Sequence, residues 1–124
     1  MKLQPDRATG VNVINAYLDD HLIVNGQVWR QPLLLSAQGD PVMWDVGRFD
    51  ELASEHFERI ARLAPELVIL GSGKRLRFAH PSITQPLMAQ RIGIETMSTA
   101  AACRTFNVLA NEGRRVLAAM LISE

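Results

Sequence analysis

The sequence predicts an α/β fold of three layers, in which helices and an antiparallel N-terminal β-hairpin layer cover a central, mixed and largely parallel sheet. Three observations carry this prediction. The first half of the chain alternates apolar and polar residues between turn signals, as antiparallel strands do. From Asp50 onwards the apolar period becomes helical. The second half alternates short apolar runs with helical segments, and connections of this length make the strands parallel and the crossovers right-handed.

The N-terminal half contains the signals of two hairpins. Residues 11–18 alternate as a half-buried strand would. Asn25-Gly26 separates two β-rich runs, and both residue types tolerate the positive φ of a type I′ turn. A second hairpin is expected around Gly39-Asp40-Pro41, which separates "PLLLSA" from "VMWDV".

A helix is expected to follow, with Asp50 as its N-cap and Pro65 as its end. Its apolar face would comprise Ala53, Phe57, Ile60 and Ala64. The remaining elements are expected as a buried strand at 67–70, a helix from Pro81 to Arg91, a strand at 93–97, a helix capped by Ser98 or Thr99 that ends near Gly113, and a closing strand at 114–122.

Length and composition indicate a globular chain. The 124 residues, with no linker or repeat, predict a single domain over 1–124, and 48% apolar with 21% charged residues is ordinary for such a domain. The formal net charge is zero, so bulk electrostatics favours neither nucleic acid nor an anionic membrane. The charge is divided, however: residues 1–65 carry six basic and nine acidic side chains (−3), and residues 66–124 carry seven and four (+3). This division gives mild support for an anionic partner of the C-terminal half.

The single Cys103 excludes an intramolecular disulfide and is typical of a reducing compartment. The sequence "MKLQPDRATG" has no apolar core of a signal peptide, and the longest apolar run, Val116 to Ile122, has seven residues where about 20 are needed to span a bilayer. We therefore expect a cytoplasmic protein of bacterial origin without a transmembrane segment.

The stretch "LVILGSGKRL" superficially resembles a phosphate-binding loop. A P-loop requires Gly five residues before Gly73, where Val68 stands, and a hydroxyl residue after Lys74, where Arg75 stands. A dinucleotide fingerprint requires Gly at position 76, which is Leu. The sequence therefore predicts no nucleotide motif here.

A weaker hypothesis is a small-anion or carboxylate site at the same place. If the strands at 67–70 and 93–97 are parallel, the glycine loop and the start of the following helix open into one crevice at their carboxyl ends. The helix N-terminus and nearby cations would attract an anion. The alternative is that the glycines only form a tight turn and that the hydroxyl residues only cap the helix. The candidate residues are Gly71, Ser72, Gly73, Lys74, Arg75, Ser98, Thr99, Arg104 and Asn107.

No other constellation predicts chemistry. His21, His56 and His80 lie far apart in sequence without nearby ligands, so we expect no metal site. Cys103, among alanines, is expected to be a small core residue rather than a nucleophile. Trp29 and Trp44 fit either a docking patch or core packing. We expect no cofactor, and the absence of a catalytic set favours a non-enzymatic domain while leaving an unrecognised enzyme open.

Two stretches, "ELVILGSGKRLRF" followed by "HP" and "IETMSTAAACRTFNVLANEGRRVLAAML", resemble the domain of unknown function 498 family. That family includes mitochondrial complex I assembly factor 3 and uncharacterised bacterial proteins, and the resemblance covers about residues 10–122. Ser72, Phe106 and Ala79 stand where Thr, Tyr and Pro are frequent in relatives. The positions that match its motif are Gly71, Gly73, Lys74, Thr99, Arg104 and Asn107.

The resemblance implies a compact three-layer α/β fold and no established enzyme activity. It implies a non-enzymatic domain that binds protein partners, as an assembly factor does while a membrane complex is built. The rival hypothesis is the small-anion site between the Gly71–Lys74 loop and the Thr99–Arg104 helix start. Fold alone does not decide between them.

Overall fold

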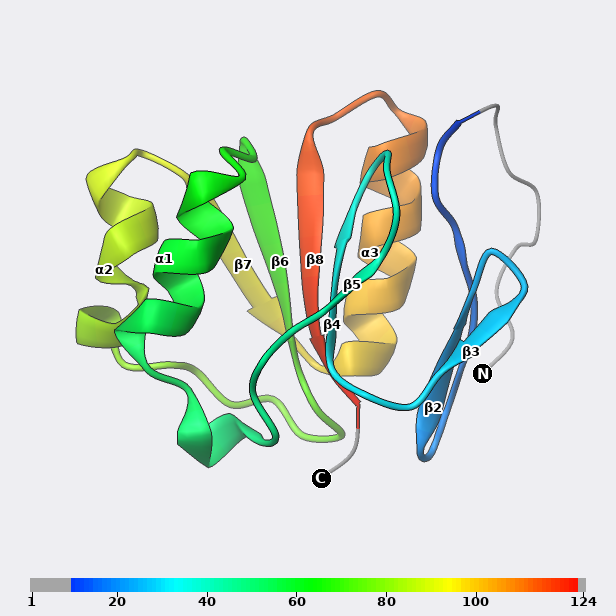
Figure 1. Ribbon diagram of the computed structural model, residues 1–124, viewed down its shortest axis with the longest axis horizontal. Helices are drawn as coiled ribbons and strands as arrows, with labels where there is room; N and C mark the ends of the chain where they lie inside the picture. Colours follow the sequence, from blue (N-terminus) through cyan, green and yellow to red (C-terminus); the bar gives the residue numbers. More distant parts are fainter. Residues whose placement is uncertain (1–9, 123–124) are drawn as a thin grey trace.

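The computed structural model describes residues 10–122 and contains two sheets with helices between and beside them (Figure 1). The strands are β1 (Ile14–Leu18), β2 (His21–Val24), β3 (Gln27–Trp29), β4 (Leu33–Ser36), β5 (Val42–Met43), β6 (Leu67–Ser72), β7 (Gly93–Met97) and β8 (Val116–Leu121). The helices are the 3₁₀ turn η1 (Phe49–Glu51), α1 (Ser54–Arg62), α2 (Pro81–Ala89) and α3 (Thr99–Asn111).

The larger sheet has the strand order β5-β4-β8-β6-β7. β6 pairs in parallel with both β8 and β7, whereas β4 pairs antiparallel with β8 and with β5. The sheet is therefore mixed, as expected, but only two of its four pairings are parallel. The second predicted hairpin exists as β4–β5, and it extends the larger sheet because Leu33 to Ser36 pair with Met120 to Leu117 of β8.

Helices cover both faces of the larger sheet (Figure 1). On one side, α1 and α2 bury an apolar cluster that includes Phe57, Ile60 and Leu87 against β6 and β8. On the other side, α3 buries Ala102, Cys103 and Phe106. The alternating side chains of β8 supply both clusters, which explains why its "VLAAML" run is buried throughout.

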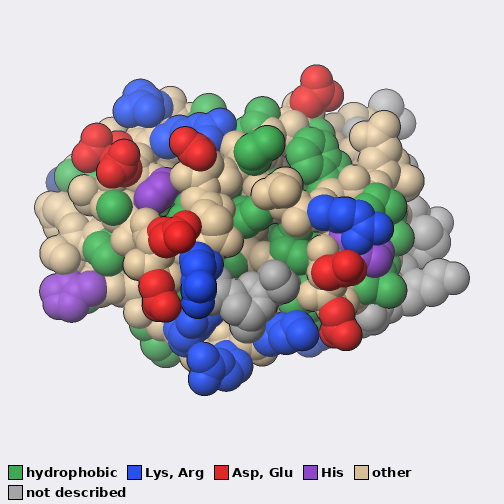
Figure 2. Space-filling model, turned by 60° about the horizontal axis from the view of Figure 1, so that its bottom comes forward, with side chains coloured by type: hydrophobic (Ala, Val, Ile, Leu, Met, Phe, Trp, Pro, Cys, Tyr) green, Lys and Arg blue, Asp and Glu red, His purple; other side chains and the backbone are tan. Residues whose placement is uncertain are grey.

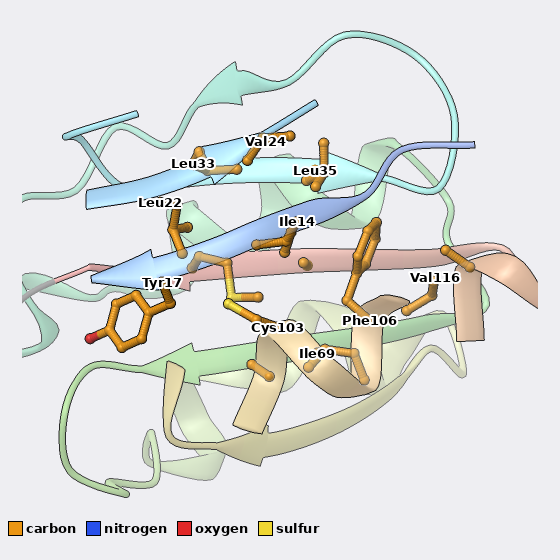
Figure 3. Close-up of a cluster of buried hydrophobic side chains, with 14 of the residues drawn as sticks. Ile14, Tyr17, Leu22, Val24, Leu33, Leu35, Ile69, Cys103, Phe106 and Val116 are labelled. Carbon is orange, nitrogen blue, oxygen red and sulfur yellow. The ribbon is translucent and has the colours of Figure 1, made fainter. Parts of the chain in front are cut away.

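The smaller sheet, in the order β1-β2-β3, packs beside α3 and forms the third layer together with that helix. Ile14 and Leu22 point from it toward Cys103 and Phe106 of α3 (Figure 3), and the Tyr17 hydroxyl donates to the Ile122 carbonyl over 2.6 Å. Its second turn, between β2 and β3, is the predicted one, since Asn25 and Gly26 have φ of 50° and 83°, the two positive values of a type I′ hairpin. The three-layer α/β prediction is confirmed.

The predicted start of the first helix is wrong. Asp50 lies in η1, and the chain is extended at Leu52 and Ala53 before α1 begins at Ser54. The cap is made by His56, whose Nδ1 accepts a hydrogen bond of 2.9 Å from the Ala53 N–H. Ala64 has φ of 51° and lies beyond the helix, so the buried face is Phe57, Ile60 and Ala61.

Other boundaries shift by a few residues. β1 begins at Ile14 rather than at residue 11, and α2 ends at Ala89 rather than Arg91, which has a left-handed φ of 58°. β6 continues two residues beyond the predicted strand and includes Gly71 and Ser72. This last difference changes the candidate site, because half of the predicted glycine loop is strand.

Candidate functional site

The carboxyl ends of β6 and β7 lie at one edge of the larger sheet, next to the start of α3, as the sequence predicts. Figure 2 shows the face that this edge belongs to, with Lys and Arg side chains gathered in its lower middle part beside several acidic ones. Gly71 pairs with Met97 of β7, and both Gly71 and Ser72 pair with residues of β8. Only Gly73, with φ of 103°, turns the chain out of the sheet.

Gly73 and Thr99 connect this edge to α3 through backbone groups and the Thr99 hydroxyl. The Gly73 N–H donates to the Thr99 Oγ1, and the Thr99 N–H donates to the Gly73 carbonyl oxygen, both over 2.9 Å. The Thr99 hydroxyl in turn donates to the Leu121 carbonyl at the end of β8, over 2.5 Å. Thr99 is completely buried, so its hydroxyl joins strand, turn and helix and does not face solvent.

Gly71 is needed for this close approach. A Cβ at this position would lie 2.7 Å from Met120 Sδ, 2.9 Å from Thr99 Oγ1 and 3.2 Å from the Thr99 Cα. Contacts this short force the helix start away from the strand. The space between Gly71 and Thr99, where the sequence suggested a crevice, is therefore filled by the protein itself.

The two serines of the candidate set also bond within the protein. Ser72 is buried, and its hydroxyl donates to the Arg75 carbonyl over 2.7 Å and accepts from the Arg77 N–H over 3.1 Å. Ser98 is the N-cap of α3, where its Oγ accepts from the Ala101 N–H over 3.3 Å. These contacts match the alternative interpretation of a tight turn and a helix cap.

The structure separates the remaining candidates. Lys74, Arg75 and Arg104 are exposed, and the Lys74 ammonium lies 3.9 Å from the Asp19 carboxylate. Asn107 bonds to a different element: its Oδ1 accepts from the Ile14 N–H and its Nδ2 donates to the Ile14 carbonyl, both over 2.9 Å. Asn107 thus holds β1 on α3 and does not line the glycine turn.

Sequence reasoning missed two exposed apolar side chains in the segment after Gly73. Leu76 is 53% exposed and Phe78 is 71% exposed, whereas Arg77 between them points inward. The Arg77 guanidinium lies 4.5 Å from the centre of the Phe49 ring, and its Nη2 donates to the Ser72 carbonyl over 3.4 Å. The alternation of "KRLRF" was the signal, since it predicts an extended segment whose alternate side chains face opposite sides.

The other predicted candidates lie apart from this edge. In the described part of the chain, no three His, Cys, Asp or Glu side chains gather as metal ligands would. Cys103 lies on the buried face of α3, and burial raises the pKa of its thiol to about 12. Trp44 is buried against Phe57 and His56, and Trp29 packs partly buried against the α3 cluster, which favours core packing over a docking patch.

A hollow of about 350 Å³ lies at the opposite edge of the larger sheet, between the ends of α1 and α3. Its two arginines are already paired: the Arg115 guanidinium donates to the Ala64 carbonyl over 2.8 Å, and Arg114 Nε lies 3.3 Å from the Glu66 carboxylate. The carbonyl-bearing ends of two helices disfavour an anion there. This hollow offers no better binding chemistry than the predicted edge.

Over residues 10–122, none of the helices is long and apolar enough to cross a bilayer. The longest, α3, has 13 residues.

Similar proteins are known. The sequence pattern of the family described as protein of unknown function (DUF498/DUF598) matches residues 14–121. NADH dehydrogenase [ubiquinone] 1 alpha subcomplex assembly factor 3 of Bos taurus is 33% identical over 110 residues, which make up 87% of this chain and 59% of the bovine protein. The chain thus spans about three fifths of the length of that relative.

Two solved structures extend the comparison. The crystal structure of a protein from Bordetella parapertussis is 35% identical, with a TM-score of 0.87 over 94% of this chain and 100% of that one. The solution structure of a Bordetella pertussis protein, described as a Mth938-like domain, is 31% identical, with a TM-score of 0.83 over 98% of this chain and 92% of that one. Sequence and fold agree with the resemblance noted from the residues alone, and the chain belongs to the DUF498/DUF598 family of proteins of unknown function.

Proposed function

We propose that this chain is a non-enzymatic, protein-binding domain that acts like an assembly factor, in the cytoplasm of a bacterium, on a membrane-associated complex. The similarity to an assembly factor of NADH dehydrogenase supports this class of function. The single structural observation that carries the proposal is an apolar surface on the smaller sheet. The closed packing around Thr99 supports it indirectly, because the edge that usually holds a ligand in α/β proteins has its hydroxyl groups bonded internally.

The smaller sheet carries apolar side chains on both faces, with His21 as the polar cross-strand partner of Leu18. Ile14, Tyr17 and Leu22 form the inner face, buried against α3. Ala16, Ile23 and Val28 are cross-strand neighbours on the opposite side. We call this side, together with Leu18, the outer sheet face.

The exposure of the outer sheet face supports a contact role. Val28 is 52% exposed and Leu18 is 42% exposed, and Ala16 and Ile23 are partly exposed between them. An antiparallel sheet with one face in water normally carries polar residues on that face. A row of apolar side chains across three strands is instead the pattern of a surface that another protein covers.

The test compares Val28→Lys with Val108→Lys. Val108 lies on α3 and is 57% exposed, so the two variants make the same chemical change at similar exposure on different surfaces. Lysine is tolerated on an edge strand and in a helix, so both variants should fold. Tagged wild-type and variant chains would be expressed in cells, and the proteins that purify with each would be quantified by mass spectrometry.

We expect proteins of a membrane-associated complex to purify with the wild type and with Val108→Lys. Their recovery should fall roughly tenfold or more with Val28→Lys, as for a central interface residue. Equal recovery with both variants would reject the outer sheet face. Recovery of no protein above background by the wild type would reject protein binding.

A second candidate function is the binding of a small anion or carboxylate, and the exposed cations Lys74, Arg75 and Arg104 support it. The other candidates at this edge already pair or bond within the protein, so such a site would depend on the charges of these three side chains alone. Those internally bonded residues are Gly71, Ser72, Gly73, Ser98 and Thr99. The anion site would therefore be shallow and sensitive to salt. Thermal unfolding with phosphate, sulfate and small carboxylates tests it: a selective rise of the melting temperature that Arg104→Ala abolishes would support the site, and no shift would reject it.

A further inference from the structure

We propose that residues 74–78, here called the docking loop, bind the surface of an anionic membrane. In this proposal Leu76 and Phe78 enter the headgroup region, and Lys74 and Arg75 contact lipid phosphates. The inference goes beyond the proposed protein binding and uses a different surface from the outer sheet face.

The docking loop combines the two chemistries that an interfacial segment needs. Phe78 and Leu76 are large apolar side chains at 71% and 53% exposure. Lys74 and Arg75 are exposed beside them, and the exposed Asp19 carboxylate, 3.9 Å from the Lys74 ammonium, is the contact that a lipid phosphate would replace. An apolar residue gains free energy on entering the boundary between headgroups and acyl chains, and neighbouring cations gain from anionic lipids. The net charge of the whole chain is zero, so the attraction in this proposal comes from Lys74 and Arg75 themselves.

The loop is held in the conformation that exposes these side chains. The buried Ser72 hydroxyl bonds to the backbone of both Arg75 and Arg77. The Arg77 side chain is directed inward, to the Phe49 ring and the Ser72 carbonyl. Anchoring of Arg77 leaves its neighbours Leu76 and Phe78 facing outward, so little conformational entropy is lost on insertion.

The shape of the site favours a bilayer over a peptide. Grooves and pockets recognise peptides by enclosing their side chains. Here the protein's own apolar side chains are exposed, and the hollow among the described residues has no lining residue from the docking loop. In Figure 1 the chain between β6 and α2 lies in the lower part of the molecule, near the ends of β6 and β7.

The test is co-sedimentation of the full chain with two kinds of vesicle at low salt. One kind contains phosphatidylcholine alone, and the other contains phosphatidylcholine mixed with phosphatidylglycerol. We expect binding to the mixed vesicles that weakens as salt is raised. Absence of binding to the mixed vesicles would overturn the proposal.

Variants separate the two contributions. Phe78→Ser should weaken vesicle binding at least about tenfold, because the free energy gained by burying a large apolar side chain corresponds to at least that factor in affinity. Val108→Ser should leave vesicle binding unchanged. Lys74→Gln and Arg75→Gln should each weaken it roughly fivefold, and Arg62→Gln, an exposed change at the far end of α1, should not. Because the replaced side chains are exposed, the melting temperatures should stay equal. Equal losses in the control variants would overturn the proposal.

Two further results would redirect the assignment. If inorganic phosphate at matched ionic strength displaced the protein from vesicles, a soluble anion would be the ligand and the lipid assignment would be wrong. If Phe78→Ser removed a co-purifying protein while the wild type bound no vesicle, the loop would be a protein-binding surface. Val28→Lys tests the proposed protein binding independently, because its outer sheet face lies on the smaller sheet.

Discussion

Gly73 and Thr99 exchange two backbone-anchored hydrogen bonds of 2.9 Å, one in each direction, across the junction of β6 and α3. The Thr99 hydroxyl continues the chain of bonds to the Leu121 carbonyl of β8. One buried hydroxyl thus ties together the turn after β6, the end of β8 and the start of α3.

Thr99→Val should destabilise the fold strongly. The variant keeps the shape of the side chain but leaves the Gly73 N–H and the Leu121 carbonyl without their partner in a buried position. Each unsatisfied buried group costs about 1–3 kcal/mol, so the free energy of unfolding should fall by about 2–4 kcal/mol in urea titrations. Thr99→Ser keeps the hydroxyl and should lose only about 1 kcal/mol, for one methyl group. A Val variant as stable as the Ser variant would contradict this role.

Asn107→Leu should loosen the smaller sheet. Its side-chain amide satisfies both backbone groups of Ile14, 93 residues away in the chain. Replacement should lower the free energy of unfolding by about 2 kcal/mol and should increase amide hydrogen exchange in β1. Asn111→Leu, at the exposed end of the same helix, is the matched control and should change neither quantity. Unaltered exchange in β1 would show that Asn107 does not hold it.

Glu66 should make stability depend on acid pH. The Arg115 N–H, which donates to its Oε1 over 2.8 Å, and the Arg114 guanidinium lower the pKa of the Glu66 carboxyl below its ordinary value of 4.5. Because the folded pKa is the lower one, the stabilisation is fully present above pH 4.5 and is lost as the pH falls through the folded pKa.

Melting temperatures of wild type and Glu66→Gln, measured from neutral pH to about pH 3, check this prediction. The wild type should be the more stable protein at neutral pH, and the difference should vanish in acid. Glu112→Gln, an exposed change beyond α3, controls for the loss of one negative charge. A difference between wild type and Glu66→Gln that is constant with pH would contradict the pairing.

Cys103 should resist alkylation in the folded protein. Burial raises the pKa of its thiol to about 12, so at pH 8 almost no thiolate is present to react, and the side chain is fully enclosed. Iodoacetamide should therefore leave the native mass unchanged and add one group in urea, which mass spectrometry can follow. Since the chain has one cysteine, no other thiol confuses the measurement. Native labelling at the rate seen in urea would refute the burial.

The sequence by itself determined the order and type of most elements and the family. Apolar periods of two and of 3.6 residues, and turn residues such as Asn25-Gly26, are local signals that hold wherever the segment packs. The long ordered match to one family is equally local, since it is read along the chain. These signals predicted the α/β class, the β2–β3 and β4–β5 hairpins and the alternation in the second half.

Where a prediction from the sequence was wrong, contacts with a neighbouring segment determined the local structure. Asp50 has the chemistry of an N-cap, but the cap of α1 is made by His56, which contacts the Ala53 N–H and the Asp45 carbonyl. Gly71 looked like part of a loop because glycine is common in turns. Its role as a strand residue beneath Thr99 depends on a helix that begins 28 residues later.

Only the tertiary structure decided the character of the candidate site. The same residues, Ser72 and Thr99, could have lined an open crevice or closed it, and their hydroxyl groups are chemically suited to both. Which occurred depended on distant carbonyl and N–H groups, because a buried polar group must find a partner wherever the fold supplies one. The fold paired them internally and left Lys74, Arg75, Leu76 and Phe78 exposed at the surface.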